Sequence, residues 1–395
     1  MVDAHEGLSA FIDELRHVED PRALRGRRHL LEDVLCISLM AMLCGCDDAD
    51  AISFWGEQHE EWLVDFLELP HGVPSQDTIL RIFSMLEPKA LELALLEWAK
   101  RRVPTVEGLC LQIDGKTVRG SGRAGEHPLH VVSVFARELG IVLAQWKGDY
   151  GRESELRSIR EVLALLSVRG ATITIDAQGC QRDIAQTIVE RGGHYVLAVK
   201  SNQPALLEDI ERVFADADDT SPRARDRRPA RQQRTHEHTD AGHGRIEVRR
   251  ISVVDDLSDM LTSERWAGLA AVARLQTETT VESSGQRRAE TRYYITSLLQ
   301  PAPEELLTTV RGHWAIENNV HWSLDVTMRE DQHHVLDKRA AAAFSAMRRY
   351  AMNLLRIAPK RKPRQSLAQT RKLCSWSPEY LATVLQGARL LETGG

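Results

Sequence analysis

Two aspartates stand at the ends of short apolar strings that predict buried strands. Asp114 closes the string LQID and Asp176 closes ITID, each directly after an isoleucine. Alternate side chains of a strand share a face, so Asp114 lies with Gln112 and Asp176 lies with Thr174. If the two strands are parallel neighbours, both carboxylates project from the same end of one sheet. Two such carboxylates repel each other unless a cation lies between them, an arrangement suited to divalent metals and phosphate chemistry.

A further set of polar side chains lies on a long helix predicted to begin near residue 304. His313, Glu317, His321 and Asp325 recur at every fourth position and therefore share one helical face. Three interpretations compete: a solvated face, a transition-metal site built on the two histidines, and a third carboxylate, Glu317, for a two-metal site. The two strand aspartates favour the third, and the spacing HxxxExxxH differs from the HExxH of zinc proteases.

The elements that must position these acids follow from the periodicity of apolar residues. Residues 8–102 are predicted to be helical. Strands are then expected at 109–118, 130–137, 141–147, 171–177 and 194–200, with helices at 154–168 and 182–191. After residue 203 the alternation breaks, and strands are expected at 245–254, 270–279 and 292–296. This order predicts an α/β fold, a mixed sheet with helices on its faces.

Composition and charge narrow the class of protein. The chain has 395 residues, of which 43% are hydrophobic and 27% charged, as in globular proteins with several domains. Its six cysteines form no CxxC pair, no apolar run is long enough for a membrane, and no export signal is expected. We therefore expect a cytoplasmic, nucleoid-associated protein. The net charge is −6, yet no acidic residue occurs between Lys338 and Leu373, which predicts a phosphate-binding basic face.

Several short motifs, in order along the chain, resemble one known family. They are PSQDTILR, IDGKTVRGS, TIDAQGCQRDIA, VKSNQP, HGRIEVR, YYITSL and RGHWAIENNVHWSLDVTMRED. With them the chain resembles the DDE insertion-sequence transposases of the ISAs-type, H-repeat-associated family. The resemblance implies an RNase H-like core interrupted by a mainly β insertion.

Carried over residue by residue, the resemblance implies that Asp114, Asp176 and Glu317 are the catalytic and metal-binding acids. Hard oxygen ligands favour Mg2+, for which Mn2+ can substitute. The implied domains are a helical, candidate DNA-binding domain at 1–105, core segments at 106–202 and 293–340, an insertion at 203–292, and a basic helical tail at 341–395.

Contacts with DNA are expected from basic and polar residues near these acids. The expected set is Lys116, Arg119, Lys200, Asn202, Gln203, Arg245, Arg249, Arg311, His313 and His321. The wider superfamily has Tyr, Arg and Lys around its glutamate, where this chain has Val310, His313 and Leu324. Asp325, Glu330 and Asp331 are weaker candidates for a metal-facing acid.

The function expected from this resemblance is metal-dependent cleavage at transposon ends, followed by strand transfer into target DNA. The partners would be double-stranded DNA, as inverted repeats and target, and a second copy of the chain, because two ends must meet. No GxxxxGK[ST] motif is present, which argues against an ATPase. The alternatives are a domesticated DNA-binding descendant without catalysis and a non-transposing RNase H-like nuclease.

Overall fold

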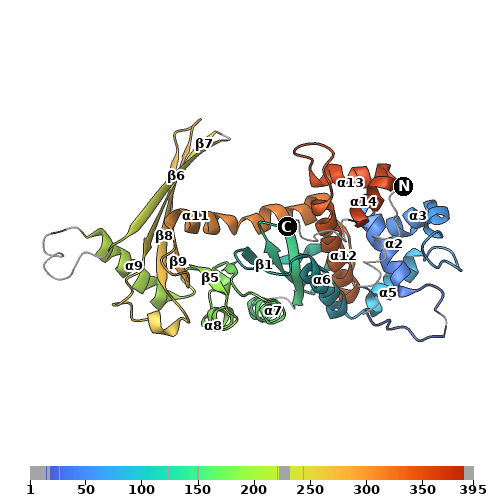
Figure 1. Cartoon of the computed structure of the whole chain (residues 1–395), viewed down its shortest axis with the longest axis horizontal. Coiled ribbons are helices and arrows are strands. Elements are labelled where there is room, and N and C mark those ends of the chain that lie inside the picture. Colours follow the sequence, from blue (N-terminus) through green and yellow to red (C-terminus); the bar gives the residue numbers. More distant parts are fainter. Residues whose placement is uncertain are drawn as a thin grey trace. The chain divides into compact units, whose positions relative to one another are not determined.

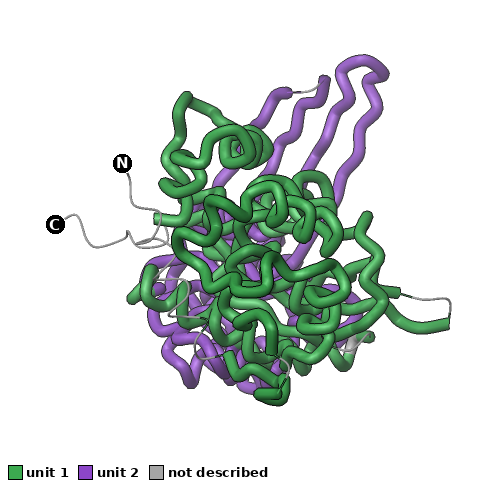
Figure 2. Tube along the Cα trace, turned by 90° about the vertical axis from the view of Figure 1, so that its right-hand side faces the viewer, with its two compact units in different colours: residues 1–105, 115–162, 316–395 green, residues 106–114, 163–315 purple. Residues whose placement is uncertain are grey.

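The computed structural model describes residues 15, 18–25, 27–122, 125–148, 151–219, 221, 232–242 and 244–386. These residues form two compact units, coloured separately in Figure 2. The first unit comprises residues 1–105, 115–162 and 316–395, and the second comprises residues 106–114 and 163–315. Strand β1 (Cys110–Val118) passes from the second unit into the first after Asp114.

The second unit is built on a mixed sheet with the strand order β1-β4-β5-β9-β8-β7-β6 (Figure 1). Its other strands are β4 (Thr172–Ile175), β5 (His194–Val199), β6 (Arg234–Gly242), β7 (Arg245–Val254), β8 (Ala271–Val281) and β9 (Arg287–Thr296). Strands β1, β4 and β5 are parallel, whereas β5, β9, β8, β7 and β6 pair in antiparallel fashion. The predicted α/β class and its mixed sheet are therefore confirmed, and the strands of the expected insertion extend this sheet through β9.

Helices pack on this sheet through apolar side chains. They are α8 (Arg182–Glu190), α9 (Pro204–Asp218) and α11 (Pro303–Gly312), with single 3-10 turns η2 (Ala177–Gly179) and η3 (Ser263–Arg265). Helix α11 begins with proline, whose missing N–H costs nothing in the first turn, and buries Leu306, Leu307 and Val310. These three side chains join Ile251 and Leu275 in one apolar core.

The first unit contains the strand order β3-β2-β1, with β2 (Leu129–Ala136) and β3 (Ile141–Gly148) forming an antiparallel hairpin. Its N-terminal helices are α2 (Leu31–Leu43), α3 (Ala49–Gln58), α4 (Glu60–Leu63), α5 (Gln76–Met85) and α6 (Pro88–Arg102). Strand β1 is followed by the turn η1 (Arg119–Ser121), and most of helix α7 (Arg152–Leu165) also belongs to the first unit. Its C-terminal helices are α12 (Lys338–Ile357), α13 (Leu367–Trp376) and α14 (Pro378–Gln386). None of the helices in the described residues is long and apolar enough to cross a membrane.

Helix α12 is the centre of the first unit. Asp337 caps it by accepting hydrogen bonds from the backbone N–H groups of Arg339 and Ala340. The side chain of Asn353 pairs with both backbone groups of Val142 in β3, at 2.8 and 2.7 Å. Most of the helix is buried, so it lies in the core of the unit.

The long helix predicted from residue 304 does not continue as an α-helix. Helix α11 ends at Gly312, and the chain then forms π-helical turns η4 (Ile316–His321) and η5 (Ser323–Thr327), followed by the 3-10 turn η6 (Glu330–Gln332). A π-helix bonds residue i to i+5 and is therefore wider than an α-helix. The expectation of one regular α-helix is therefore wrong beyond Gly312, and the shared polar face of His313, Glu317, His321 and Asp325 stays a prediction.

Candidate functional site

The parallel pairing of β1 with β4 fixes where the two strand aspartates lie. Ile113 is paired with Ile175, so Asp114 and Asp176 each follow the last paired residue of neighbouring strands. Parallel neighbours are about 4.8 Å apart, and equal register gives equal side-chain facing. Both aspartates are partly exposed. The sequence prediction that these two acids meet at one end of the sheet is consistent with this register.

Asp176 is oriented by the turn that follows it. Its Oδ1 accepts hydrogen bonds from the backbone N–H groups of Gln178, at 2.9 Å, and Gly179, at 3.2 Å. Asp176 is therefore the N-cap of the 3-10 turn η2. A carboxylate bound in this way has a defined direction relative to the strand that carries it.

The turn after β5 contacts the turn after β4. The side-chain amide of Asn202 donates to the backbone carbonyl of Ala177 at 2.6 Å, and that of Gln203 donates to Cys180 at 2.9 Å. These two residues were expected to contact DNA. In the structure their amides bind backbone carbonyls at the start of η2 and just after it.

His313 lies on the face of β4 that carries Asp176. Its Nδ1 and the hydroxyl of Thr174 are 3.1 Å apart, and Thr174 lies two residues before Asp176 in the strand. Burial lowers the pKa of His313, although the negative charge of Asp176 acts in the opposite direction. The imidazole is therefore neutral near pH 7, and its expected contact with DNA stays a prediction.

Glu317 is exposed in the first π-helical turn, η4, of the first unit. Its neighbours Asn318 and Asn319 are also exposed, whereas Ile316 and Val320 are buried. The apolar residues hold the turn against the unit while the acid points to solvent. Turns of this type are frequent at functional sites.

Lys116 lies at the centre of an acidic cluster in the first unit. Its Nζ is 2.7 Å from Asp325, 3.3 Å from Glu330 and 3.2 Å from Asp331, and only 6% of its side chain is exposed. Burial opposes the charge, but the three carboxylates outweigh it and raise the pKa of Lys116. The expected contact between Lys116 and a scissile phosphate stays a prediction. The three carboxylates already bound to Lys116 compete with a phosphate for its ammonium group.

Glu330 is the buried member of this cluster. Its side chain is fully buried and accepts hydrogen bonds from the guanidinium of Arg349, at 3.0 Å, and the hydroxyl of Ser345, at 2.9 Å. Burial opposes ionisation, but Arg349 and Lys116 outweigh it and lower the pKa of Glu330 to about 2. From the sequence, Glu330 was predicted only as a weaker candidate for a metal-facing acid. The signal for its structural role was the run of arginines after residue 338, because buried arginines need acidic partners from elsewhere in the chain.

His321 is close to the same cluster. Burial, with the charges of Arg349 and Lys116, lowers its pKa to about 3. The ring is therefore uncharged at neutral pH and contributes no positive charge toward a phosphate. Its expected role in DNA binding stays a prediction that would depend on hydrogen bonding alone.

The other expected DNA contacts differ in their surroundings. Arg119, 83% exposed, has its Nε 3.7 Å from Asp331, and Lys200 and Arg245 are also exposed. Arg249 pairs with Asp240 and Glu247, and Arg311 pairs with the same Asp240 at 2.7 Å. Among the expected set, Arg119, Lys200 and Arg245 are thus the cations most accessible to DNA.

The basic stretch after residue 338 does not form a solvated face throughout. Arg348 and Arg349 are buried in α12, and Arg371 of α13 forms an ion pair with Asp47. Arg348 donates to the backbone carbonyl of Asp47. Glu330 and Asp47, the acidic partners of Arg349 and Arg371, lie outside the basic stretch, which is why a local count of charges missed them. The prediction of a continuous phosphate-binding face is wrong for these three arginines.

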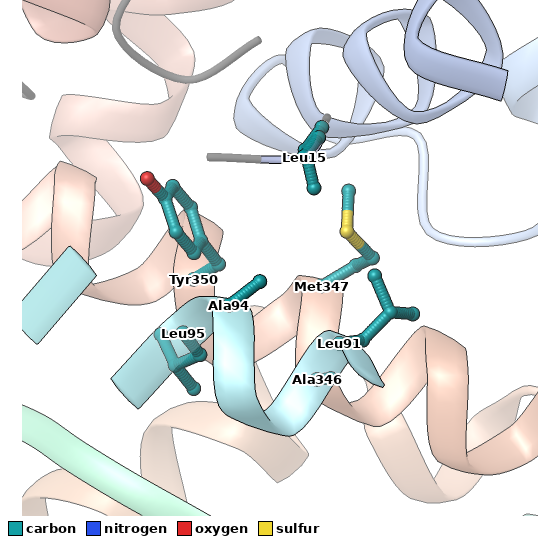
Figure 3. A pocket seen from close by; sticks show the side chains of 7 residues that line it. All are labelled: Leu15, Leu91, Ala94, Leu95, Ala346, Met347 and Tyr350. Atoms are coloured by element: carbon teal, nitrogen blue, oxygen red, sulfur yellow. The ribbon is translucent and has the colours of Figure 1, made fainter. Parts of the chain in front are cut away.

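The metal-binding capacity of the acids follows from their chemistry. In the part of the chain that the structure describes, no group of three His, Cys, Asp or Glu side chains is arranged around a metal position. Asp114 and Asp176 nevertheless offer hard oxygen donors at adjacent strand ends, which suit Mg2+ better than a soft metal. An apolar pocket in the first unit, lined by Leu15, Leu91, Met347 and Tyr350 among others, offers no comparable donors (Figure 3).

The mixed sheet, with Asp114 and Asp176 at neighbouring strand ends, agrees with the core that the resemblance to DDE transposases implies. Residues 107–354 match the family described as transposase DDE domain, and residues 12–99 match the segment described as DDE_Tnp_1-associated. The chain belongs to this transposase family. The predicted function class, DNA transposase, is thereby confirmed at the level of the family.

Individual relatives agree with this assignment. The chain is 33% identical over 358 residues to "Putative transposase YncI" of Escherichia coli O157:H7, covering 88% of each protein. It is 30% identical over 394 residues to "H repeat-associated putative transposase YhhI" of Escherichia coli K12, covering 97% of this chain and 99% of the relative. A cryo-EM structure of the piggyBac transposase synaptic complex with hairpin DNA aligns over 100% of this chain and 83% of its own, with a TM-score of 0.44 and 10% identity.

Proposed function

We propose that this protein cleaves DNA at the ends of a transposable element and joins those ends to target DNA. The observation that carries the proposal is the register of β1 and β4, which places Asp114 and Asp176 after the paired residues Ile113 and Ile175. Membership of the transposase DDE domain family supports the same chemistry. The family acts with a divalent metal ion, and the oxygen donors of this chain favour Mg2+, with Mn2+ as a substitute.

We propose Glu317 as the third acid. His313 contacts Thr174 on the face of β4 that carries Asp176, and Glu317 follows His313 by four residues. Four residues of chain span at most about 14 Å, so the Cα atoms of His313 and Glu317 cannot be farther apart than that. The exposure of Glu317 leaves its carboxylate accessible to a ligand.

In this proposal the side chains have separate tasks. Asp114, Asp176 and Glu317 hold the metal, which supplies activation of water or a 3′-hydroxyl and neutralisation of the leaving oxygen. The backbone N–H groups of Gln178 and Gly179 orient Asp176 before DNA arrives. The exposed Arg119, together with Lys200 and Arg245, contacts the phosphate backbone and contributes affinity without reading sequence.

We further propose that the protein acts on double-stranded DNA as a homodimer. Both ends of an element must be cut and joined, so two copies of the site are needed at one time. This assembly, the cytoplasmic location and the five expected domains are proposals that rest on the sequence and on membership of the family.

The decisive experiment uses the full chain and a DNA fragment that carries its gene with the flanking segments on both sides. We expect nicking and strand transfer with Mg2+ in the wild type, and loss of both in Asp114→Asn and Glu317→Gln while DNA binding is retained. Glu190→Gln, which changes an exposed carboxylate on α8, serves as the matched control. Cleavage that persists in Asp114→Asn would reject the proposal. Binding without cleavage in the wild type would favour a domesticated descendant, and cleavage without joining would favour a nuclease.

A further inference from the structure

Two turns at neighbouring strand ends of the second unit are joined by side-chain hydrogen bonds. The first turn follows β4 and contains Asp176 and η2, and the second follows β5 and contains Asn202 and Gln203. Asn202 donates to the carbonyl of Ala177 at 2.6 Å, and Gln203 donates to that of Cys180 at 2.9 Å. The two acceptors are the first residue of η2 and the residue just after it.

The first turn has little stability of its own. Turn η2 has three residues, and a single 3-10 turn fixes several backbone dihedrals for few hydrogen bonds. The carboxylate of Asp176 is held by the N–H groups of Gln178 and Gly179, which belong to this turn. The direction of the carboxylate therefore depends on whatever holds the turn in place.

The second turn is firmly built. The N–H of Gln203 donates to the carbonyl of Lys200 at 3.0 Å, and its carbonyl accepts the N–H of Leu207 at 2.9 Å. Pro204 then opens helix α9, whose Leu206 is buried in the unit. Strand β5, which leads into this turn, is paired on both sides, with β4 and β9. Asn202 and Gln203 thus extend from a rigid support toward a weakly stable turn.

We propose that Asn202 and Gln203 are positioning residues that hold the Asp176 carboxylate in the direction a divalent cation requires. The inference rests on the proposed function and deepens it. Mg2+ demands near-octahedral geometry, so a small rotation of one ligand weakens its binding. Groups that orient a ligand without touching the metal are worth about 10- to 100-fold in metal affinity or activity. This role replaces the contact with DNA expected from the sequence for these two amides.

The test compares variants of the full chain with Mn2+ alone as the probe. Asn202→Asp keeps the shape of the side chain but places an acceptor against the Ala177 carbonyl, and Asn202→Ala and Gln203→Ala remove the donors without adding charge. We expect Mn2+ affinity, measured from free Mn2+ by electron paramagnetic resonance, to fall about tenfold in each. Amide hydrogen exchange at residues 177–180 should accelerate. Gln186→Ala, an exposed amide on α8 that donates to Glu190, is the matched control and should change neither quantity.

A second measurement separates positioning from DNA contact. Binding to a duplex of arbitrary sequence is measured at one fixed salt concentration, because a neutral amide that contacts a phosphate contributes affinity without releasing counterions. Weaker DNA binding with unchanged Mn2+ affinity would overturn the inference. Faster exchange with unchanged Mn2+ affinity would also overturn it, because the turn would then be held without any effect on the metal. If Asn202→Asp does not fold, the two alanine variants decide.

Failure of the proposed function is recognised independently. Asp176→Asn should abolish Mn2+ binding at this site and DNA cleavage together. If both survive in Asp176→Asn, the metal site is elsewhere and the proposed function fails, whatever the turn does. If both are lost while the Asn202 and Gln203 variants bind Mn2+ normally, the proposed function stands and only the positioning role is rejected.

Discussion

The Asp176 turn of the second unit and the Lys116 cluster of the first unit stabilise acidic residues by different physics. Asp176 accepts hydrogen bonds from neutral backbone N–H groups. The turn that supplies these groups is in turn bound by the neutral side-chain amides of Asn202 and Gln203. Lys116 is surrounded by three carboxylates, the deepest of which also pairs with the buried Arg349. Neutral hydrogen bonds contribute about 1 kcal/mol each, whereas removing one partner of a buried ion pair costs about 3–5 kcal/mol.

The difference suggests a division of roles. A turn held by neutral hydrogen bonds orients a ligand while leaving its charge available to a cation. A cluster in which charges already neutralise one another fixes the fold around it and has little charge left for a ligand. This contrast explains why the acids after Glu317 are poorer metal candidates than the two strand aspartates.

Glu330→Gln should have the largest effect on stability. It removes the charge that faces the fully buried Arg349, and we expect the free energy of unfolding to fall by about 3–5 kcal/mol. Urea unfolding followed by circular dichroism measures this change. A loss below about 1 kcal/mol would show that the cluster is not the fixed element we describe, and Asp325→Asn, at a position 38% exposed, is the control with a smaller expected loss.

The same residue predicts a pH dependence. The pKa of Glu330 is lowered to about 2 from an ordinary 4.5, so its contribution to stability is present above pH 4.5 and is lost as the pH falls toward 2. The wild type should therefore lose stability over this acidic range, and Glu330→Gln should lose less.

Lys116→Met should have the next largest effect. It leaves three carboxylates without their common cation, but two of them are partly exposed and can be hydrated. We expect a loss of about 2–3 kcal/mol, measured by the same urea titration. Lys116→Arg, which keeps the charge, should recover part of that loss, and equal losses in both variants would contradict an electrostatic role.

Glu92 sharpens the comparison because it is a buried glutamate held by a neutral group. Its carboxylate accepts the backbone N–H of Lys147 at 2.8 Å, and burial outweighs that hydrogen bond and raises its pKa to about 8. The folded protein holds this proton more tightly than the unfolded chain, so stability falls as the pH rises from 4.5 to about 8. Glu92→Gln should remove this pH dependence, so that thermal stability stays level over this range. An unchanged pH profile would show that Glu92 is not the titrating group.

Arg119→Ala should have the smallest effect on stability. Its side chain is 83% exposed, and exposed ion pairs contribute little to folding. Thermal unfolding should be unchanged, whereas the salt dependence of binding to duplex DNA should lose about one unit of slope. A large change in melting temperature would place Arg119 with the structural cluster instead.

The local elements of this fold could be predicted well from the sequence. The strands expected at 109–118, 130–137 and 141–147 correspond to β1, β2 and β3, and those expected at 245–254 and 270–279 correspond to β7 and β8. Period-two alternation and the turns between strands are local properties, so short-range patterns suffice. The π-helical turns around Glu317 could not be predicted. Over so few residues, the spacing of apolar side chains does not distinguish a π-helical turn from an α-helix.

The sequence by itself determined the two strand-end aspartates, the mixed α/β class and, through its ordered motifs, the transposase family. Only the tertiary structure decided which polar residues are free for a ligand. Lys116 and Arg349 are basic in the sequence whatever surrounds them. Asp331 lies 215 residues from Lys116, and Glu330 lies 19 residues from Arg349, so both pairs form only after folding. Asn202 and Gln203 show the same dependence, since an amide suited to DNA and an amide suited to a backbone carbonyl are identical until the neighbouring strand is in place.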